Sequence, residues 1–198
     1  MRGVVKRSVI IAGVGGQGLI TIGSILGEAL AARGYNISVG EVHGLSQRGG
    51  SVVVFLKYGD GAVSPIVTQS EGDVLVGLEL IEAVRRLPLM KKDGVVVVND
   101  FLLPPPGSKT VPARDELLAA LPRGNTYVLD ARELALKAGS DIALNMVMLG
   151  AVVATGVLDL ESSEVEGVLS KRFKGEFLKI NLQALRLGYD SIKKGPKY

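Results

Sequence analysis

Short apolar runs alternate with amphipathic segments along most of the chain, a pattern typical of α/β proteins. Residues 9–12 are apolar and uncharged, as in a strand that is buried on both faces of a sheet. Apolar side chains at helical spacing then predict a helix over about residues 17–33 that ends at Gly34. Residues 37–42 predict a second strand, which completes a βαβ unit.

The next stretch predicts an antiparallel hairpin. Residues 52–58 and 62–67 are largely apolar, and they flank the tripeptide Gly59-Asp60-Gly61, which suits a short turn. Because the two arms of a hairpin run antiparallel, the sheet is expected to be mixed.

The remainder of the chain continues the alternation. The predicted strands cover residues 73–78, 94–99 and 126–130, and the predicted helices cover residues 79–86, 115–121, 131–138, 142–155, 162–173 and 176–194. Residues 101–112 contain four prolines and predict an extended loop within the domain. We therefore predict one α/β domain over residues 1–198, Rossmann-like and layered, with a mainly parallel central sheet, an added antiparallel β-hairpin and C-terminal helices.

Composition excludes several kinds of chemistry. The chain has no cysteine, so it contains no disulfide, no thiolate nucleophile and no cysteine-ligated iron–sulfur cluster. His43 is the only histidine, which excludes a metal site made of several histidines and leaves a Ser-His-Asp triad one possible base. Hydrophobic residues make up 47% of the chain and aromatic residues only 5%, which indicates an aliphatic core and hints at an apolar surface for a partner.

Charge and hydropathy favour a cytoplasmic protein without nucleic acid or membrane partners. The net charge is +3, and residues 171–197 carry eight Lys or Arg against two acids. Such a segment is usually a solvated helix face and less often an anion or partner surface. The uncharged residues 142–158 are too few for a membrane span, which needs about 20 residues, and we expect no signal peptide.

A glycine-rich turn follows the first predicted strand and opens the first predicted helix. Gly13, Gly15 and Gly18 fit the pattern G-x-G-x-x-G, and Gly16 adds a fourth glycine. The backbone N–H groups of such a turn can hold an anion, and Glu41, at the end of the second strand, could bind the ribose of a dinucleotide. Alternatively, the glycines only permit close packing and a subunit contact; the pattern leaves both interpretations open.

Polar candidates gather in the loop over residues 41–51. His43 could act as a base that Glu41 orients, since residues two apart share one face of a strand, although a structural histidine is the commoner case. The guanidinium of Arg48 suits a phosphate or a carboxylate, or it pairs with an acid such as Glu41 on the surface. Asn145 interrupts an apolar run, and a helix cap or a structural hydrogen bond is its expected role.

Four blocks of the chain carry a family resemblance. They are G-V-G-G-Q-G at residues 13–18, G-E-V-H-G-L-S-Q-R-G-G-S at residues 40–51, D-V-L-V-G-L-E at residues 73–79 and N-M-V-M-L-G at residues 145–150. Together and in this order, they resemble the γ-type domain of the 2-oxoacid:ferredoxin oxidoreductases, and most of all its indolepyruvate branch. The second block is far more specific than the glycine turn.

The resemblance implies a subunit of an enzyme that converts aryl pyruvates of the indolepyruvate type and coenzyme A into acyl-CoA and CO2, with electrons passing to ferredoxin. Thiamine diphosphate, Mg²⁺ and 4Fe-4S clusters would belong to a larger α subunit. This chain would hold no metal or cofactor alone, would be inactive alone, and would complete the active site or the coenzyme A site.

The residues expected at that site come from the glycine turn and the following loop. They are Gly13, Gly15, Gly16, Gln17, Gly18, Glu41, Ser46, Gln47, Arg48, Gly49 and Gly50, with His43 and Arg48 as candidates for a catalytic role. The alternative function is a free-standing NAD(P)-binding oxidoreductase that uses the turn and Glu41. A scaffold without any ligand is the third possibility.

Overall fold

The computed structural model describes residues 6–44, 50–61, 64–105 and 107–194. Within them lies a six-stranded mixed sheet in the order β2-β3-β1-β4-β5-β6. Four neighbouring strands run parallel: β1 (Lys6–Val14), β4 (Gly72–Gly77), β5 (Met90–Asn99) and β6 (Thr126–Leu129). β3 (Ser51–Gly59) runs antiparallel to β1 and to the edge strand β2 (Asn36–His43).

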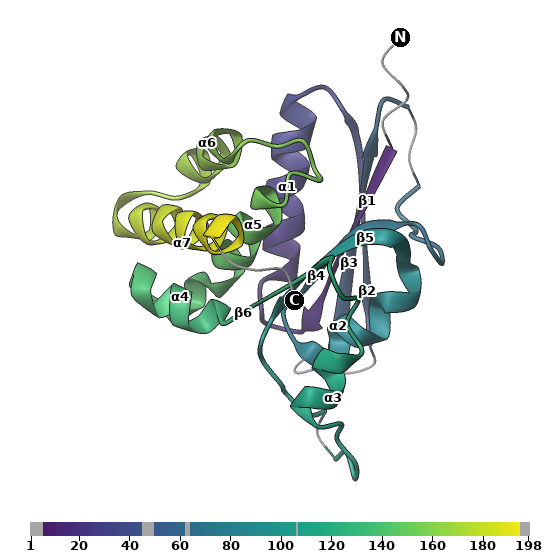
Figure 1. The fold of residues 1–198 in the computed structure, drawn as a ribbon. Helices are drawn as coiled ribbons and strands as arrows, with labels where there is room; N and C mark the ends of the chain where they lie inside the picture. Colours follow the sequence, from purple (N-terminus) through teal and green to yellow (C-terminus); the bar gives the residue numbers. More distant parts are fainter. Residues whose placement is uncertain (1–5, 45–49, 62–63, 106, 195–198) are drawn as a thin grey trace.

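Helices cover both faces of this sheet (Figure 1). One face carries α1 (Leu19–Ala32), α4 (Ala131–Ala138), α5 (Leu144–Ala154), α6 (Ser162–Arg172) and α7 (Gly175–Lys194). The other face carries the short helices α2 (Leu80–Arg86) and α3 (Arg114–Ala119). Single 3₁₀ turns lie at Leu87–Leu89 and Asp141–Ala143. The layered arrangement with a mainly parallel sheet confirms the predicted fold class.

Alternating side chains of the strands divide the interior into two cores. In β1, Val9 and Ile11 pack toward α1 and α5, whereas Ile10 and Ala12 pack toward α2 and α3. Both sets are fully buried, which explains why this part of the strand is apolar at every position. No helix in the described part of the chain is long and apolar enough to cross a membrane.

The predicted hairpin of residues 52–58 and 62–67 is wrong in its pairing. β3 is an interior strand that pairs with β2 and β1, and Ser64–Val67 form no strand; Ala62 and Val63 lie outside the described residues. The antiparallel hairpin is instead β2–β3. β3 contributes side chains to both cores, so it is apolar at nearly every position and its composition does not show which strands pair with it.

A buried lysine of β3 holds the irregular segment that follows this strand. The buried Lys57 Nζ donates to Ile66 O (2.9 Å) and to Glu71 Oε1 (2.5 Å), which fixes the irregular segment after β3.

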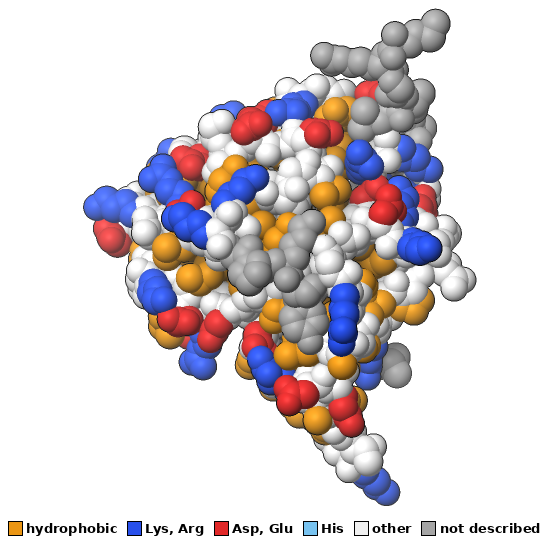
Figure 2. All heavy atoms as spheres, in the orientation of Figure 1, with side chains coloured by type: hydrophobic (Ala, Val, Ile, Leu, Met, Phe, Trp, Pro, Cys, Tyr) orange, Lys and Arg blue, Asp and Glu red, His pale blue; other side chains and the backbone are white. Residues whose placement is uncertain are grey.

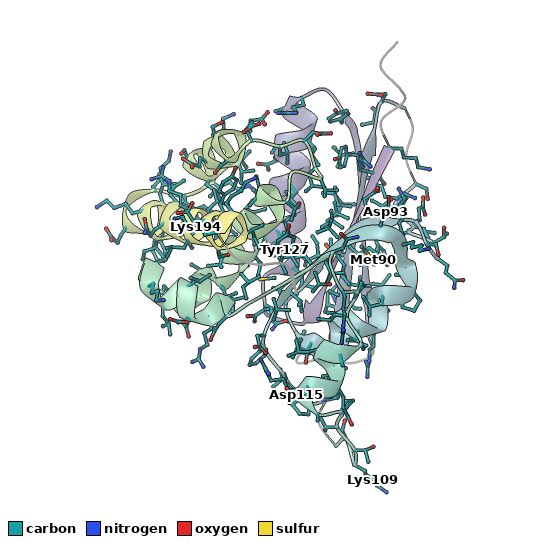
Figure 3. The ribbon with its side chains drawn as sticks, in the orientation of Figure 1. Met90, Asp93, Lys109, Asp115, Tyr127 and Lys194 are labelled. Carbon is teal, nitrogen blue, oxygen red and sulfur yellow. The ribbon has the colours of Figure 1, made fainter. Side chains whose placement is uncertain are left out.

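The proline-containing stretch before α3 extends away from the sheet, with Lys109 near its tip (Figure 3). The prediction of a loop is confirmed for residues 101–105 and 107–112, which form no helix or strand.

Candidate functional site

The glycine turn and the following loop meet at one edge of the sheet. β1 and β2 end there and β3 begins there, because β3 runs opposite to both. The backbone N–H of Gly15 donates to Gly50 O at 3.0 Å, and Gly44 N donates to Ser51 O at 2.9 Å. The Gly15–Gly50 bond joins the turn to the base of the loop, as the sequence predicts, and the Gly44–Ser51 bond joins the two ends of the loop to each other.

The glycine turn depends on the absence of side chains. Gly16 and Gly18 have φ angles of +101° and +80°, in the left-handed region that favours glycine. A Cβ on Gly13 would lie 2.5 Å from Gln17 Oε1. That oxygen accepts a hydrogen bond from Val14 N (2.7 Å), and Gln17 Nε2 donates to Leu78 O (3.3 Å). The Gln17 amide therefore closes the turn from inside.

A cavity of about 330 Å³ opens in front of the turn. Helix α1 begins there with Gly18 as its N-cap, without a side-chain cap and without an acid in the first turn. The first N–H groups of a helix lack partners within the helix and lie at its positive end, so an anionic group suits this position. The lining residues are Gly15, Gly16, Gly18, Leu19, Ile20, Thr21, His43 and Val52.

His43 and Glu41 form a pair on the rim of this cavity. The His43 Nε2 and Glu41 Oε2 atoms are 3.0 Å apart, and the two side chains are 49% and 36% exposed. They contact each other because residues two apart in β2 share one face of the strand. His43 also lines the cavity, so the pair joins a carboxylate and an imidazole beside the start of α1.

Other predicted residues are placed as follows. Ser46, Gln47, Arg48 and Gly49 lie outside the described residues, while Gly50 is the loop residue bonded to Gly15.

Asn145 lies in the first turn of α5, whose N-cap is Ala143, so it is not a helix cap. Its side chain packs against the turn: a Cβ on Gly18 would lie 2.3 Å from Asn145 Nδ2. The block of sequence that begins at Asn145 is therefore in contact with the glycine turn, although more than a hundred residues separate them.

A second cavity beside the first escaped the sequence-based prediction. It has a volume of about 240 Å³, shares Thr21 with the first cavity and is lined mainly by residues of α5 and α7 and of the turn before α5. Ile142 and Phe177 at its rim are 85% and 74% exposed. No local pattern marks these residues, because they come together only when α1, α5 and α7 pack.

In the part of the basic C-terminal segment that the structure describes, several charges are paired at the surface. Over α6 and α7, blue and red side chains alternate on the face shown in Figure 2. Arg186 pairs with Glu166 and Lys194 with Asp190, both at 2.9 Å. Hydrogen bonding to Arg186 lowers the pKa of Glu166, and the same bond raises the pKa of Arg186. These basic side chains are paired with acidic neighbours, which is typical of the solvated helix face that the sequence predicts.

The described residues do not match a metal site or a dinucleotide site. They contain no group of three or more His, Cys, Asp or Glu that could hold a metal ion. In the dinucleotide fold, the strand that carries the ribose-binding acid lies beside the first strand. Here β3 lies between β1 and β2, so Glu41 is displaced by two strand spacings, about 10 Å, from the strand before the turn.

Comparisons with known proteins agree with the family resemblance seen in the sequence. The family model described as pyruvate ferredoxin/flavodoxin oxidoreductase matches residues 8–191. The chain is 34% identical to the indolepyruvate oxidoreductase subunit IorB of Pyrococcus horikoshii, over 95% of this chain and 96% of the relative. It is 31% identical to the common subunit gamma of the pyruvate/ketoisovalerate oxidoreductases of Pyrococcus abyssi, over 91% of this chain and 94% of the relative.

Solved structures show the same architecture. The pyruvate oxidoreductase subunit PORC of Thermotoga maritima matches with a TM-score of 0.72 and 25% identity, over 93% of this chain and 96% of that one. The 2-oxoglutarate:ferredoxin oxidoreductase of Magnetococcus marinus has a TM-score of 0.76 at 22% identity. That match covers 98% of this chain but 32% of the longer chain, so there the same fold forms part of a larger polypeptide.

Proposed function

The chain belongs to the pyruvate ferredoxin/flavodoxin oxidoreductase family, and from this premise we propose that it is the small subunit of an aryl-pyruvate:ferredoxin oxidoreductase of the indolepyruvate type. The observation that carries the proposal is its end-to-end similarity to indolepyruvate oxidoreductase subunits, at 34% and 36% identity for two of them. The absence of cysteine supports a division of labour in which the clusters lie on another chain.

The overall reaction joins an aryl pyruvate and coenzyme A, releases CO2 and passes two electrons to ferredoxin. Thiamine diphosphate with Mg²⁺ on the larger subunit would supply the carbon nucleophile, and its 4Fe-4S clusters would carry the electrons. This chain contributes an anion-compatible surface that completes the active site or the coenzyme A site.

The residues given this role surround the larger cavity. Backbone N–H groups at the start of α1 face a space with no acid in the first helical turn, which suits a phosphate of coenzyme A. His43 at the rim, oriented by Glu41, donates or accepts a hydrogen bond there. Arg48, from the same loop by sequence, is assigned to a phosphate or carboxylate of the substrate.

Reconstitution with the larger subunit tests the proposal. The two chains together should reduce a viologen dye in the presence of indolepyruvate and coenzyme A, and neither chain alone should do so. Dye reduction by this chain alone, or unchanged turnover when it is added to its partner, contradicts the proposal.

Calorimetry on the assembled complex separates the ligand classes. Coenzyme A should bind and NAD should not, because Glu41 pairs with His43 and lies two strands from β1. Arg48→Ala should weaken coenzyme A binding while assembly is retained. Unchanged binding and turnover in that variant would favour the scaffold role instead.

A further inference from the structure

Ser51 connects the loop at the site to helix α2. It is the first residue of β3, and its Oγ lies 2.5 Å from Glu82 Oε2 and 3.1 Å from Arg86 Nη2. The hydroxyl donates to the carboxylate and accepts from the guanidinium. A hydroxyl can do both at once, whereas alanine can do neither.

Glu82 is a buried carboxylate, and the Ser51 hydroxyl is one of its hydrogen-bond donors. Its side chain is 5% exposed, and Arg85 Nη1 donates to its second oxygen at 3.1 Å. A buried carboxylate is tolerated when it is paired and hydrogen-bonded. Its backbone N–H is capped by Glu79 (2.8 Å), which also accepts from Leu103 N (3.0 Å). These bonds hold the first turn of α2 in place independently of Ser51.

The guanidinium of Arg86 lies beside both Ser51 and Glu82. Its Nε atom is buried and has no hydrogen-bond partner in the described part of the chain. The same guanidinium nevertheless donates from Nη2 to Ser51 Oγ. Its Nη2 also lies 3.8 Å from Glu82 Oε2, so the guanidinium contacts both the hydroxyl and the carboxylate beside the loop base.

The backbone around Ser51 is bonded to the glycine turn and to Gly44, the residue after β2. Gly50 O accepts from Gly15 N, and Ser51 O accepts from Gly44 N. The base of the loop is therefore held on one side by the turn and on the other by α2. We propose that Glu82 and Arg86 are positioning residues that act through Ser51 to hold the loop base against the coenzyme A site. This inference rests on the proposed function.

The test uses the reconstituted complex and separates kcat from KM. Ser51→Ala and Glu82→Gln should each raise the KM for coenzyme A about tenfold, the effect of losing a hydrogen bond to a charged group, and change kcat less than about twofold. Ser51→Thr retains the hydroxyl and should restore most of the wild-type KM. Glu82→Gln keeps the shape of the side chain, so it reports on positioning if Ser51→Ala lowers assembly.

Asp73→Asn is the matched control. Asp73 is another buried carboxylate with basic partners, bonded to Lys91 Nζ (2.7 Å) and Ser8 N (2.8 Å), but it lies at the opposite end of β4. It should lower thermal stability without changing the KM. If Ser51→Ala and Glu82→Gln also leave the KM for coenzyme A unchanged, the cluster only stabilises the fold and the inference is refuted. If the wild-type complex does not need this chain for turnover, the proposed function fails and the inference falls with it.

Discussion

The crossing of α5 and α7 brings two helix backbones into close approach, and it predicts the effect of one methyl group. Gly150 of α5 and Gly188 of α7 face the partner helix reciprocally. A Cβ on Gly188 would lie 1.9 Å from Val147 O, and a Cβ on Gly150 would lie 1.9 Å from Leu185 O. Both obstacles are backbone atoms, which cannot rotate aside.

The magnitude follows from the separation that the methyl group needs. Since Cβ contacts below 3.0 Å essentially do not occur, Gly188→Ala must move the helices apart by at least 1.1 Å, the difference between 3.0 and 1.9 Å. Forced overpacking is unfavourable by about 1–3 kcal/mol, and a backbone obstacle places this site at the upper end. Alanine offsets about 1 kcal/mol of this through its helix propensity. We expect a net loss of about 2 kcal/mol and a Tm lower by about 4–8 °C.

Thermal and urea unfolding of the purified chain measure this effect. Gly167→Ala is the control, because Gly167 is exposed within α6 and a Cβ there meets nothing within 4 Å. It should raise stability by about 0.5–1 kcal/mol. The double variant Gly150→Ala/Gly188→Ala should lose less than the sum of the single variants, because one separation accommodates both methyl groups. A Gly188→Ala protein that melts at or above the wild-type temperature would refute the reasoning.

Three further outcomes follow from other contacts. Gly18→Ala places a Cβ at a φ of +80° and 2.3 Å from a side-chain atom of α5, so it should lower the Tm by several degrees and weaken coenzyme A binding; an unchanged protein in calorimetry would contradict this. Burial opposes ionisation of Glu71, but hydrogen bonds from Lys57 and a neighbouring threonine outweigh it and lower its pKa from 4.5 to about 2. A depressed pKa gives stability that is present above about pH 4.5 and is lost toward pH 2, on the order of 2–3 kcal/mol. Between pH 5.5 and pH 2.5, the urea midpoint should therefore fall more for the wild type than for Glu71→Gln. Arg33→Ala removes a partly exposed double hydrogen bond to Glu164 and should change the free energy of unfolding by less than about 1 kcal/mol, with a larger value in denaturant titrations counting against that view.

Elements with strong local signals are predictable from the sequence. The valine run of β5 and helix α4 are found because buried parallel strands and amphipathic helices each have a distinct period. The sequence predicts Glu79 as the first residue of a helix, and in the structure it is the N-cap, one residue away. The first residue of a helix depends on the conformation of one backbone turn, and contacts with neighbouring residues determine that conformation.

Contacts between distant segments are not predictable in this way. The run that forms β3 has the composition of any buried strand, and nothing local shows that it pairs with β1 and β2 at once. Gly150 belongs to an apolar helix, and only the approach of α7 explains why a side chain is excluded. Gln17 is expected from the sequence to bind a cofactor, but its amide is bonded within the turn and to Leu78 O, just after the neighbouring strand β4.

The position of β3 also changes the meaning of the glycine turn. A G-x-G-x-x-G turn offers the same backbone N–H groups in any protein, so the ligand is selected by what lies beside it. With β2 next to β1, that neighbour would be the acid at the end of the second strand. With β3 inserted, the neighbour is the base of the loop, joined at Gly50 and held through Ser51. We therefore expect the turn to bind its ligand together with the loop, so that a substitution that frees the loop base alters ligand binding even where every glycine of the turn is intact.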